Sequence, residues 1–523
     1  MDFLRCNRCG KCREVCPVAG SEIVEWASAR GKFEIAEAFF RGEKLSEKSV
    51  RSIFDLCLHC KTCEENCPSG ARGDRVVSEV LAEMGRRGVI PLMKKIALKV
   101  LDRADSFIFR VIRFAGGGGK AQPHRGRGKS PLRFMYPLLG WPVQRLLPLP
   151  AKKPFIRKGP DIFEAAGVEQ MLRNLNPDIG SDDFDSEAAA GLIEKIRAAR
   201  EDNLKNGRKA LFFVGDAVNQ FFGDEAEDIV LVLNFLGIDV QVPQDQTCCF
   251  APALYAGDTM RAAEGARRLV KILSRYDFDW LVTSCASGGL MLREEYPRLL
   301  GLTDDSYGGV VYDSESELVR INERQNERTE EGNLYLDSIA ERVRDINELV
   351  GDLLGYRPGR PGYHFLFSGG KEKEIAGAGQ RRPDGVPAVV YHQPCHLNRG
   401  QKISGEPVYI LKLLPGVRFI KMANADICCG GGGLFTFTEP EISARVGREK
   451  ARWIAEADPD MVATSCPLCR IQIADMLQRD YGKDMPPNMD RICLIPVLTP
   501  IQLLARDLRR MSGEKSEHRA NLP

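Results

Sequence analysis

The sequence predicts a multidomain protein of α+β and α/β class, with an α-helical N-terminal region followed by two repeated α/β units. Three observations support this fold class. A chain of 523 residues has room for several domains, each with its own core. Landmarks in the second half recur at an offset of about 180 residues. Short apolar runs such as KALFFVG and PAVVYH are typical of strands in a buried parallel sheet.

Eight of the 17 cysteines form two copies of one pattern, CNRCGKCREVCP at residues 6–17 and CLHCKTCEENCP at residues 57–68. This spacing is that of a two-cluster ferredoxin, in which the fourth cysteine of each run binds the other cluster. We therefore expect two cubane 4Fe–4S clusters, and two zinc knuckles are the alternative. The expected ligand sets are Cys6, Cys9, Cys12 and Cys67 for one cluster, and Cys57, Cys60, Cys63 and Cys16 for the other.

The segment between the two runs carries serine caps and apolar residues at helical spacing. Residues 1–87 therefore resemble the α-helical ferredoxin of succinate dehydrogenase iron–sulfur subunits. His59 lies inside the second run, and we expect it to be a solvated or packed neighbour of the cluster, with tuning of the cluster's potential as a further role open to it.

The repeat that follows aligns residues that come after predicted strands. The offsets are 179, 180 and 181 for the pairs Asp216–Cys395, Cys248–Cys428 and Cys285–Cys466. Each copy alternates strands with helices, and the aligned residues fall at the carboxyl edge of the sheet, where α/β proteins usually hold ligands. We expect a first copy at 207–301 and a second at 386–482, with a connecting helical segment at 161–206.

The stretch ICCGGGGLF places Cys428 and Cys429 side by side and follows them with four glycines. Glycines cost ordering entropy unless the chain needs an unusual backbone conformation or a close approach. We interpret this loop as one that folds around a metal–sulfur cluster. A buried pair of inert thiols and a vicinal disulfide are the alternatives.

The second copy resembles the cysteine-rich CCG domain of the B-type and D-type subunits of heterodisulfide reductase. The same domain occurs in iron–sulfur subunits of glycolate oxidase, lactate-utilisation and anaerobic glycerol-3-phosphate dehydrogenase systems. A double ferredoxin followed by two CCG domains is similar to the D-type component of heterodisulfide reductase and to the iron–sulfur component of glycolate oxidase. The resemblance implies a noncubane 4Fe–4S cluster held by five cysteines, Cys395, Cys428, Cys429, Cys466 and Cys469.

The first copy departs from this pattern, because Asp216 replaces the leading cysteine and Gly288 the last one. The remaining set, Cys248, Cys249 and Cys285 with Asp216, suits zinc or a small iron site, or is an empty structural remnant.

Two histidines flank the first cysteine of the second copy. We expect His392 and His396 either to hydrogen-bond a cluster thiolate, to donate protons in disulfide chemistry, or to serve only structural hydrogen bonds. Cys493 has no partner pattern and is expected in the core.

Residues 88–160 form a basic linker, with twelve Lys or Arg and no Asp or Glu between Ser106 and Pro160. The residues Phe134, Tyr136 and Trp141 favour contact with an anionic membrane or a membrane subunit, although a solvated linker is the alternative. No nucleic-acid reading motif accompanies this charge. The charged insertion at 302–385 has no readable role, and residues 483–523 form a C-terminal helix and tail.

The net charge of +2, and the lack of an apolar leader or a membrane-spanning run, predict a cytoplasmic protein on the cytoplasmic face of the membrane. We expect an iron–sulfur oxidoreductase subunit that relays electrons between a flavoprotein dehydrogenase and a membrane quinone-reactive subunit, since no flavin or nicotinamide fingerprint is present. The alternatives are the catalytic subunit of a heterodisulfide-type reductase, acting through Cys428 and Cys429, and a zinc-stabilised scaffold.

Overall fold

The computed structural model describes residues 2–22, 24–101, 154–158, 165–178, 184–303, 309–312, 318–321, 330–358, 385–479 and 486–514. Within these ranges, no helix combines the length and the apolar character needed to cross a membrane. Most of the expected basic linker, with Phe134, Tyr136 and Trp141, lies outside the described residues.

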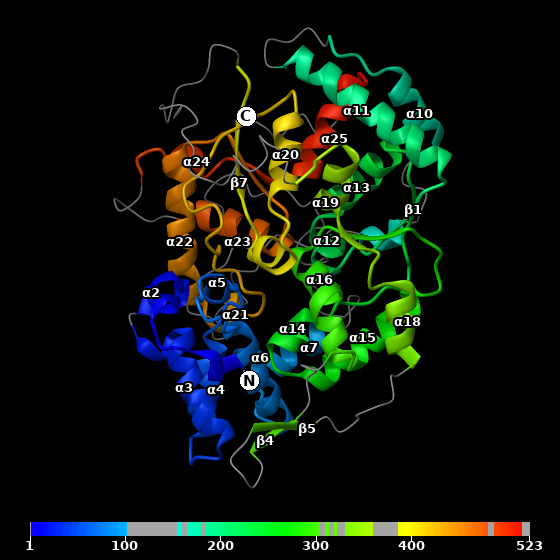
Figure 1. The fold of residues 1–523 in the computed structure, drawn as a ribbon. Coiled ribbons are helices and arrows are strands. Elements are labelled where there is room, and N and C mark those ends of the chain that lie inside the picture. Colours follow the sequence, from blue (N-terminus) through cyan, green and yellow to red (C-terminus); the bar gives the residue numbers. More distant parts are fainter. Residues whose placement is uncertain are drawn as a thin grey trace.

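The N-terminal region consists of helices around the two cysteine runs, drawn in blue in Figure 1. The side chains of Ser28 and Ser46 cap the two helices between the runs, as their spacing predicts. Phe33, Phe54 and Val80 lie in the buried core that these helices share. The helices are α1 (Lys11–Val15), α2 (Pro17–Glu22), α3 (Ala29–Phe40), α4 (Glu47–Asp55), α5 (Thr62–Glu65), α6 (Gly73–Arg86) and α7 (Leu92–Leu101).

The first α/β unit contains a parallel sheet of order β2-β1-β3-β6. Its fourth strand lies within residues 302–385, so this segment is not only an insertion between the two copies but completes the first sheet. The strands are β1 (Lys209–Phe212), β2 (Asp239–Gln241), β3 (Trp280–Thr283) and β6 (Val343–Asp345). The helices are α12 (Asp216–Phe221), α13 (Gly223–Phe235), α14 (Ala251–Tyr255), α15 (Thr259–Leu273), α16 (Ala286–Leu290), α17 (Tyr296–Leu299), α18 (Glu330–Ser338) and α19 (Ile346–Leu353).

The second unit has the same strand order when the strands are matched by their place in the repeat, β8-β7-β9-β10. The two parallel sheets and the helical N-terminal region agree with the predicted fold class. The strands are β7 (Ala388–His392), β8 (Arg418–Phe419), β9 (Met461–Thr464) and β10 (Val497–Leu498). The helices are α20 (Gly405–Leu413), α21 (Phe435–Thr438), α22 (Pro440–Ala457), α23 (Pro467–Leu477), α24 (Met489–Ile492) and α25 (Pro500–Met511).

The last helix of each unit packs against the other unit. In each unit the fourth strand leads into a helix with a capping box, Asp345 with Glu348 at α19 and Thr499 with Gln502 at α25. Helix α19 packs against α20 of the second unit, and α25 packs against α13 of the first. Figure 1 shows these four helices together between the two sheets. The packing is reciprocal, so the two units share one buried core.

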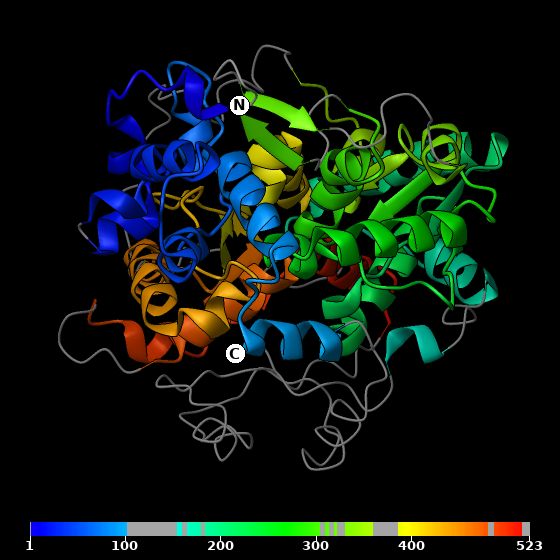
Figure 2. The same cartoon turned by 90° about the horizontal axis from the view of Figure 1, so that it is seen from below.

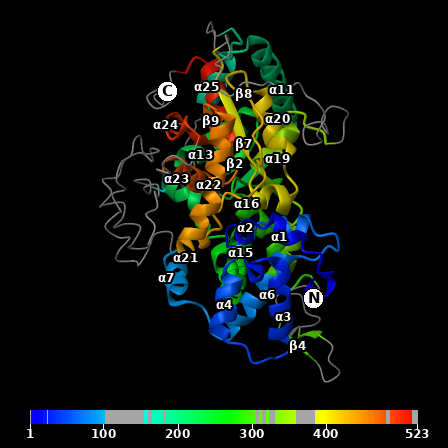
Figure 3. The same ribbon diagram turned by 90° about the vertical axis from the view of Figure 1, so that its left-hand side faces the viewer.

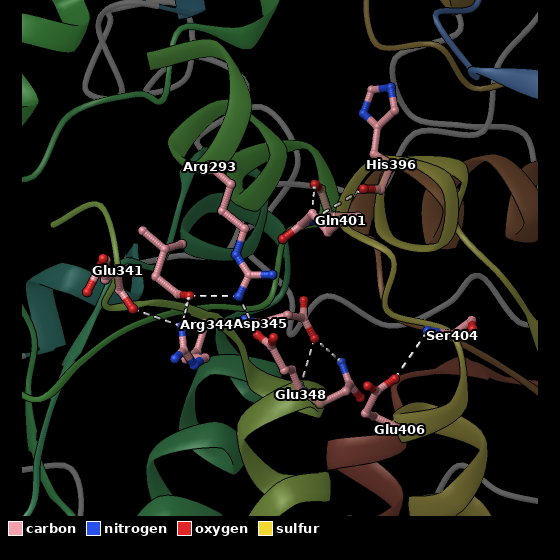
Figure 4. A network of polar contacts seen from close by, with 12 residues as sticks. Arg293, Glu341, Arg344, Asp345, Glu348, His396, Gln401, Ser404 and Glu406 are labelled. Atoms are coloured by element: carbon pink, nitrogen blue, oxygen red, sulfur yellow. Dashed lines mark hydrogen bonds and ion pairs between the residues drawn. The ribbon is translucent and has the colours of Figure 1, made fainter. Parts of the chain in front are cut away.

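A polar network also crosses the boundary between the two units (Figure 4). Gln401 donates from Nε2 to the carbonyl of Ala286 in the first unit, at 2.8 Å. Arg293 pairs with Glu348 and donates to the carbonyl of Val343 at 2.7 Å, which ties β6 to the helix that follows β3. Gln401 therefore links the two units, and Arg293 fixes β6 within the first.

Two helices precede the first sheet, and α7 and a short antiparallel pair lie toward the outside of the molecule. Helices α10 (Ala165–Arg173) and α11 (Ser186–Lys205) precede the first sheet, and α7 lies at the edge of the molecule in Figure 3. The antiparallel pair β4 (Gly309–Tyr312) and β5 (Leu318–Ile321) lies near the N-terminus in Figure 2, beside α3.

Candidate metal centres

A small cavity at the N-terminal end brings together thiols from both cysteine runs. It is lined by Cys6, Cys9 and Cys12 of the first run and by Cys67 of the second, which are the four residues grouped from the spacing. The backbone N–H of Ala71 donates to Cys67 Sγ at 3.2 Å, and such N–H···S contacts are typical of cluster thiolates.

The second predicted set is buried beside the first. Burial raises the pKa of Cys57 to about 12, and it is also the main cause that raises the pKa of Cys63. The charges of Cys16 and Cys60 raise both pKa values further. These mutual effects mean that the four thiols lie close together. Cys63 also lines the cavity of the first set, so the two sets adjoin. A Cβ at Gly73 would lie only 2.8 Å from Cys63 Sγ, which explains the glycine at the start of α6.

The five cysteines of the second CCG copy converge at the carboxyl edge of its sheet. Cys395 follows β7, Cys428 and Cys429 lie in the loop after β8, and Cys466 is the N-cap of α23, with Cys469 in its first turn. Cys429 Sγ lies 3.4 Å from Cys469 Sγ. Contact with the Cys428 thiol is the main cause that raises the pKa of Cys395 well above its usual value. All but Cys395 are at most 6% exposed, and all five are free thiols.

The glycine-rich loop has the conformation that its sequence requires. Gly430, Gly432 and Gly433 all have positive φ, at 83°, 56° and 59°, which side chains rarely adopt. A Cβ at Gly430 would also lie 2.7 Å from the carbonyl oxygen of Ser443 on α22. The Gly430 N–H donates to Cys428 Sγ at 3.4 Å. The loop thus turns tightly beside the two thiols and directs an N–H at one of them.

The incomplete cysteine set of the first copy lies at the equivalent edge of its own sheet. Contact with Cys249, burial and the Asp216 carboxylate all raise the pKa of Cys248. Cys285 is the N-cap of α16, and contact with Cys466 of the second copy is the main cause that raises its pKa. Cys285 therefore lies between the two sites, a relationship that the spacing could not reveal.

His396 serves as a junction between three parts of the chain. Its Nε2 lies 3.0 Å from the carbonyl oxygen of His59, and its Nδ1 lies 2.9 Å from Ser287 Oγ. A carbonyl can only accept, so Nε2 carries the hydrogen and Nδ1 accepts from Ser287. Tyr255 of the first unit packs beside both imidazole rings, and its ring centroid lies 4.6 Å from that of His59 and 5.7 Å from that of His396.

His392 is fully buried and approaches the thiols of the second copy. Its Nδ1 lies 3.1 Å from the carbonyl oxygen of Ala425, and its Nε2 has no hydrogen-bond partner in the described part of the chain. One ring nitrogen and the sulfurs of Cys429 and Cys469 all lie within 4.8 Å of one another. Burial is the main cause that lowers the pKa of His392 well below its usual value.

Sequence patterns did not single out two buried cations near this site. Lys450 on α22 is 1% exposed, and its Nζ lies 2.5 Å from the carbonyl oxygen of Asn424. Arg399 binds Glu65 of the ferredoxin region at 2.5 Å and Asp426 at 2.6 Å, and so ties that region to the loop before Cys428. Lys450 lies in the charged run REKAR, which usually indicates a solvated surface, and Arg399 lies in the segment LNRGQ, which carries no metal-site pattern.

Comparison with known families agrees with the cysteine patterns. Residues 2–71 match the 4Fe-4S dicluster domain, and residues 210–293 and 389–474 both match the cysteine-rich domain family CCG. The dicluster match indicates two cubane 4Fe–4S clusters, and the CCG matches are consistent with further iron–sulfur sites. The expected pair of CCG domains after a double ferredoxin is thus confirmed.

Several curated proteins are similar to this chain. A probable glycolate oxidase iron–sulfur subunit of Bacillus subtilis is 22% identical over 92% of this chain and 90% of its own length. A subunit of the fumarate reductase (CoM/CoB) of Methanothermobacter marburgensis is 29% identical over 52% of this chain. An uncharacterised iron–sulfur protein of Methanococcus maripaludis is 28% identical over 57% of this chain. The chain covers only 43% and 46% of the length of the last two relatives.

Proposed function

We propose, on the premise that this chain joins a 4Fe-4S dicluster domain to two CCG domains, that it relays electrons within an oxidoreductase complex. The donor would be a partner flavoprotein dehydrogenase, and the acceptor a membrane quinone-linked subunit. The similarity to a protein named as a probable glycolate oxidase iron–sulfur subunit supports this assignment. The sequence carries no recognisable flavin or nicotinamide fingerprint, so hydride chemistry would occur on the partner.

The observation that carries this proposal is the contact between Cys60 and Cys428. Contact with the Cys428 thiol is the largest cause that raises the pKa of Cys60. Leu58 and Phe435 belong to the same buried cluster, which excludes water from this boundary. Because Cys63 lines the cavity of the first set, the three ligand sets form a continuous series across the molecule.

Each ligand set fits the group that it would hold. Cys6, Cys9, Cys12 and Cys67 would bind one cubane cluster, and Cys16, Cys57, Cys60 and Cys63 the other. The five cysteines of the second CCG copy would bind a noncubane 4Fe–4S cluster. Such clusters, when bound, exchange single electrons with their neighbours. Cys248, Cys249, Cys285 and Asp216 would hold zinc or remain empty.

The membrane half of the proposal is supported by one described element. On α7 the apolar side chains of Leu92, Met93 and Ile96 are 70%, 47% and 47% exposed, and Lys95 and Lys99 are exposed beside them. An exposed face of this composition suits the interfacial region of an anionic membrane or an acidic partner. Salt should weaken such binding.

Two measurements test the relay. The isolated chain should show little dehydrogenase activity with 2-hydroxy acids, but a partner flavoprotein should reduce its clusters. In cell fractionation at low salt it should sediment with membranes, and high salt should release it. Dehydrogenase activity of the isolated chain would refute the relay, and full recovery in the supernatant at low salt would refute the membrane contact.

A second candidate is a heterodisulfide-type reductase, because the five-cysteine set is complete and one relative is named as a CoM/CoB fumarate reductase subunit. The burial of Cys428 and Cys429, each 3% exposed, argues against it, since a disulfide substrate must reach the site. Rapid reduction of a disulfide by the isolated chain with reduced viologen would favour this candidate over the relay.

A further inference from the structure

The imidazole of His392 is oriented as metal-binding histidines usually are. Its Nδ1 lies 3.1 Å from the carbonyl oxygen of Ala425, and a carbonyl can only accept, so Nδ1 carries the ring hydrogen. In neutral imidazole the other nitrogen, Nε2, then has a free lone pair. A hydrogen bond from one ring nitrogen to a backbone carbonyl fixes the tautomer and orientation of histidine ligands in many metal sites.

The free nitrogen has no hydrogen-bond partner among the residues that the structure describes. His392 is 0% exposed, and Nε2 is a buried polar atom without a hydrogen bond. Buried polar groups are nearly always satisfied, so an orphan of this kind needs an explanation. The nearby ligand atoms are Cys429 Sγ and Cys469 Sγ, which lie 3.4 Å apart and within 4.8 Å of one of the two imidazole nitrogens. A metal ion in contact with both sulfurs would satisfy the lone pair.

The internal repeat gives an independent comparison. With the offset that aligns Asp216 with Cys395, the residue equivalent to His392 is Phe213. Phe213 is fully buried in an apolar cluster. The copy that lacks the first and last cysteines thus also lacks this histidine, whereas the copy with all five cysteines has it. A histidine with a purely structural role at the end of this strand would have no reason to be present only in the copy that has all five cysteines.

We propose that His392 is a nitrogen ligand of the metal centre in the second CCG copy, bound through Nε2 beside Cys429 and Cys469. The centre would then have mixed sulfur and nitrogen ligation, and the Ala425 carbonyl would position the ring. This inference rests on the proposed function only in placing an iron–sulfur cluster at this site.

The test is pulsed EPR of the paramagnetic state of this centre, in protein made with natural and with ¹⁵N-labelled histidine. We expect a strong nitrogen coupling that changes from a ¹⁴N to a ¹⁵N pattern with the label. The variant His392→Phe reproduces the side chain of the first copy, and it should lose the coupling. The control variants His396→Gln and His59→Gln should keep the coupling.

Iron content separates the two proposals. If Cys429→Ala loses about four irons but the wild-type centre shows no histidine coupling, the ligand is refuted and the cluster stands. A coupling that persists in His392→Phe would likewise refute the ligand. If Cys429→Ala loses no iron, the cluster itself is refuted, and with it this ligand. Should His392→Phe fail to assemble the centre, the labelled wild type and the two controls still decide the outcome.

Discussion

The thiol of Cys60, in the second ferredoxin run, lies against the thiol of Cys428, in the glycine-rich loop of the second CCG copy. Removing this thiol should therefore affect both sites. We expect Cys60→Ala to lower the iron content by about four and to slow electron equilibration between the remaining centres by about tenfold or more. The measurement is iron analysis with freeze-quench EPR after mixing with substoichiometric dithionite.

Cys493 provides the matched control for this variant. It is half-buried rather than in the core, and its thiol donates to the carbonyl of Asp490 at 3.1 Å. It belongs to no ligand set, so Cys493→Ala should keep the wild-type iron content and rates. The relay would lose its main support if Cys60→Ala equilibrated as fast as the wild type.

Total iron should follow the three complete ligand sets. Anaerobically reconstituted protein should contain on the order of twelve irons, from two cubanes and one noncubane cluster. The variant Cys429→Ala should lose about four, because Cys429 contacts both Cys428 and Cys469 and so lies at the centre of its set. A reproducible content of eight irons that this variant does not change would rule out the third cluster.

The first CCG copy should respond differently at two of its cysteines. Cys248 interacts mainly with Cys249 and Asp216, so Cys248→Ser should leave iron near the wild-type value and remove any zinc. Cys285 lies against Cys466, so Cys285→Ser should alter the EPR spectrum of the second copy's centre. Loss of about four irons in Cys248→Ser would mean that the first copy holds a cluster of its own.

The sequence predicted the members of each group of thiols, and the structure added the contacts between the groups. Ligands of one metal centre must converge, so their spacing is visible in the sequence. The contacts Cys60–Cys428 and Cys285–Cys466 depend on how separate units pack, and no local pattern encodes this packing. Lys450 lies in the run REKARW, whose charges resemble those of a solvated helix face.

The offset of about 180 residues predicts the repeat, but it does not predict the fourth strand and the last helix of each unit. Strands β6 and β10 have only three and two residues, which are too few to show a periodic pattern in the sequence. The capping boxes at Asp345 and Thr499 were the available signal for the helices that follow. These helices lie at different distances from the aligned cysteines in the two copies, so a constant offset could not match them.

Stability should depend on pH through Glu225, which links the two units by an ion pair with Arg470 at 3.1 Å. Burial raises the pKa of Glu225 from 4.5 to about 7. Between pH 4.5 and about 7 the folded state therefore binds more protons than the unfolded state, so stability falls as pH rises through this window. The full effect is on the order of 3 kcal/mol.

The variant Glu225→Gln should remove this pH dependence. The difference in melting temperature between variant and wild type should shift in favour of the variant by a few degrees between pH 5.5 and pH 8. Thermal unfolding under anaerobic conditions measures it, with Glu201→Gln, at an exposed position on α11, as the control for general charge effects. A difference that stays constant across this range would contradict the assignment.

Lys450 should raise the reduction potential of the centre in the second CCG copy. It is buried on α22, and the charges of Cys429 and Cys428 interact with its ammonium group. Burial lowers the pKa of Lys450 to about 8, so the side chain is still largely protonated at pH 7.

A positive charge stabilises the reduced, more negative state of a nearby centre. At an effective dielectric constant near 20, a charge several ångströms away contributes on the order of 2–3 kcal/mol, which is roughly 90–130 mV for one electron. Potentiometric titration followed by EPR should therefore show a potential lower by about this amount in Lys450→Met, and little change in Lys412→Met, whose side chain is exposed on α20. An unchanged or higher potential in Lys450→Met would show that this buried charge does not act on the centre.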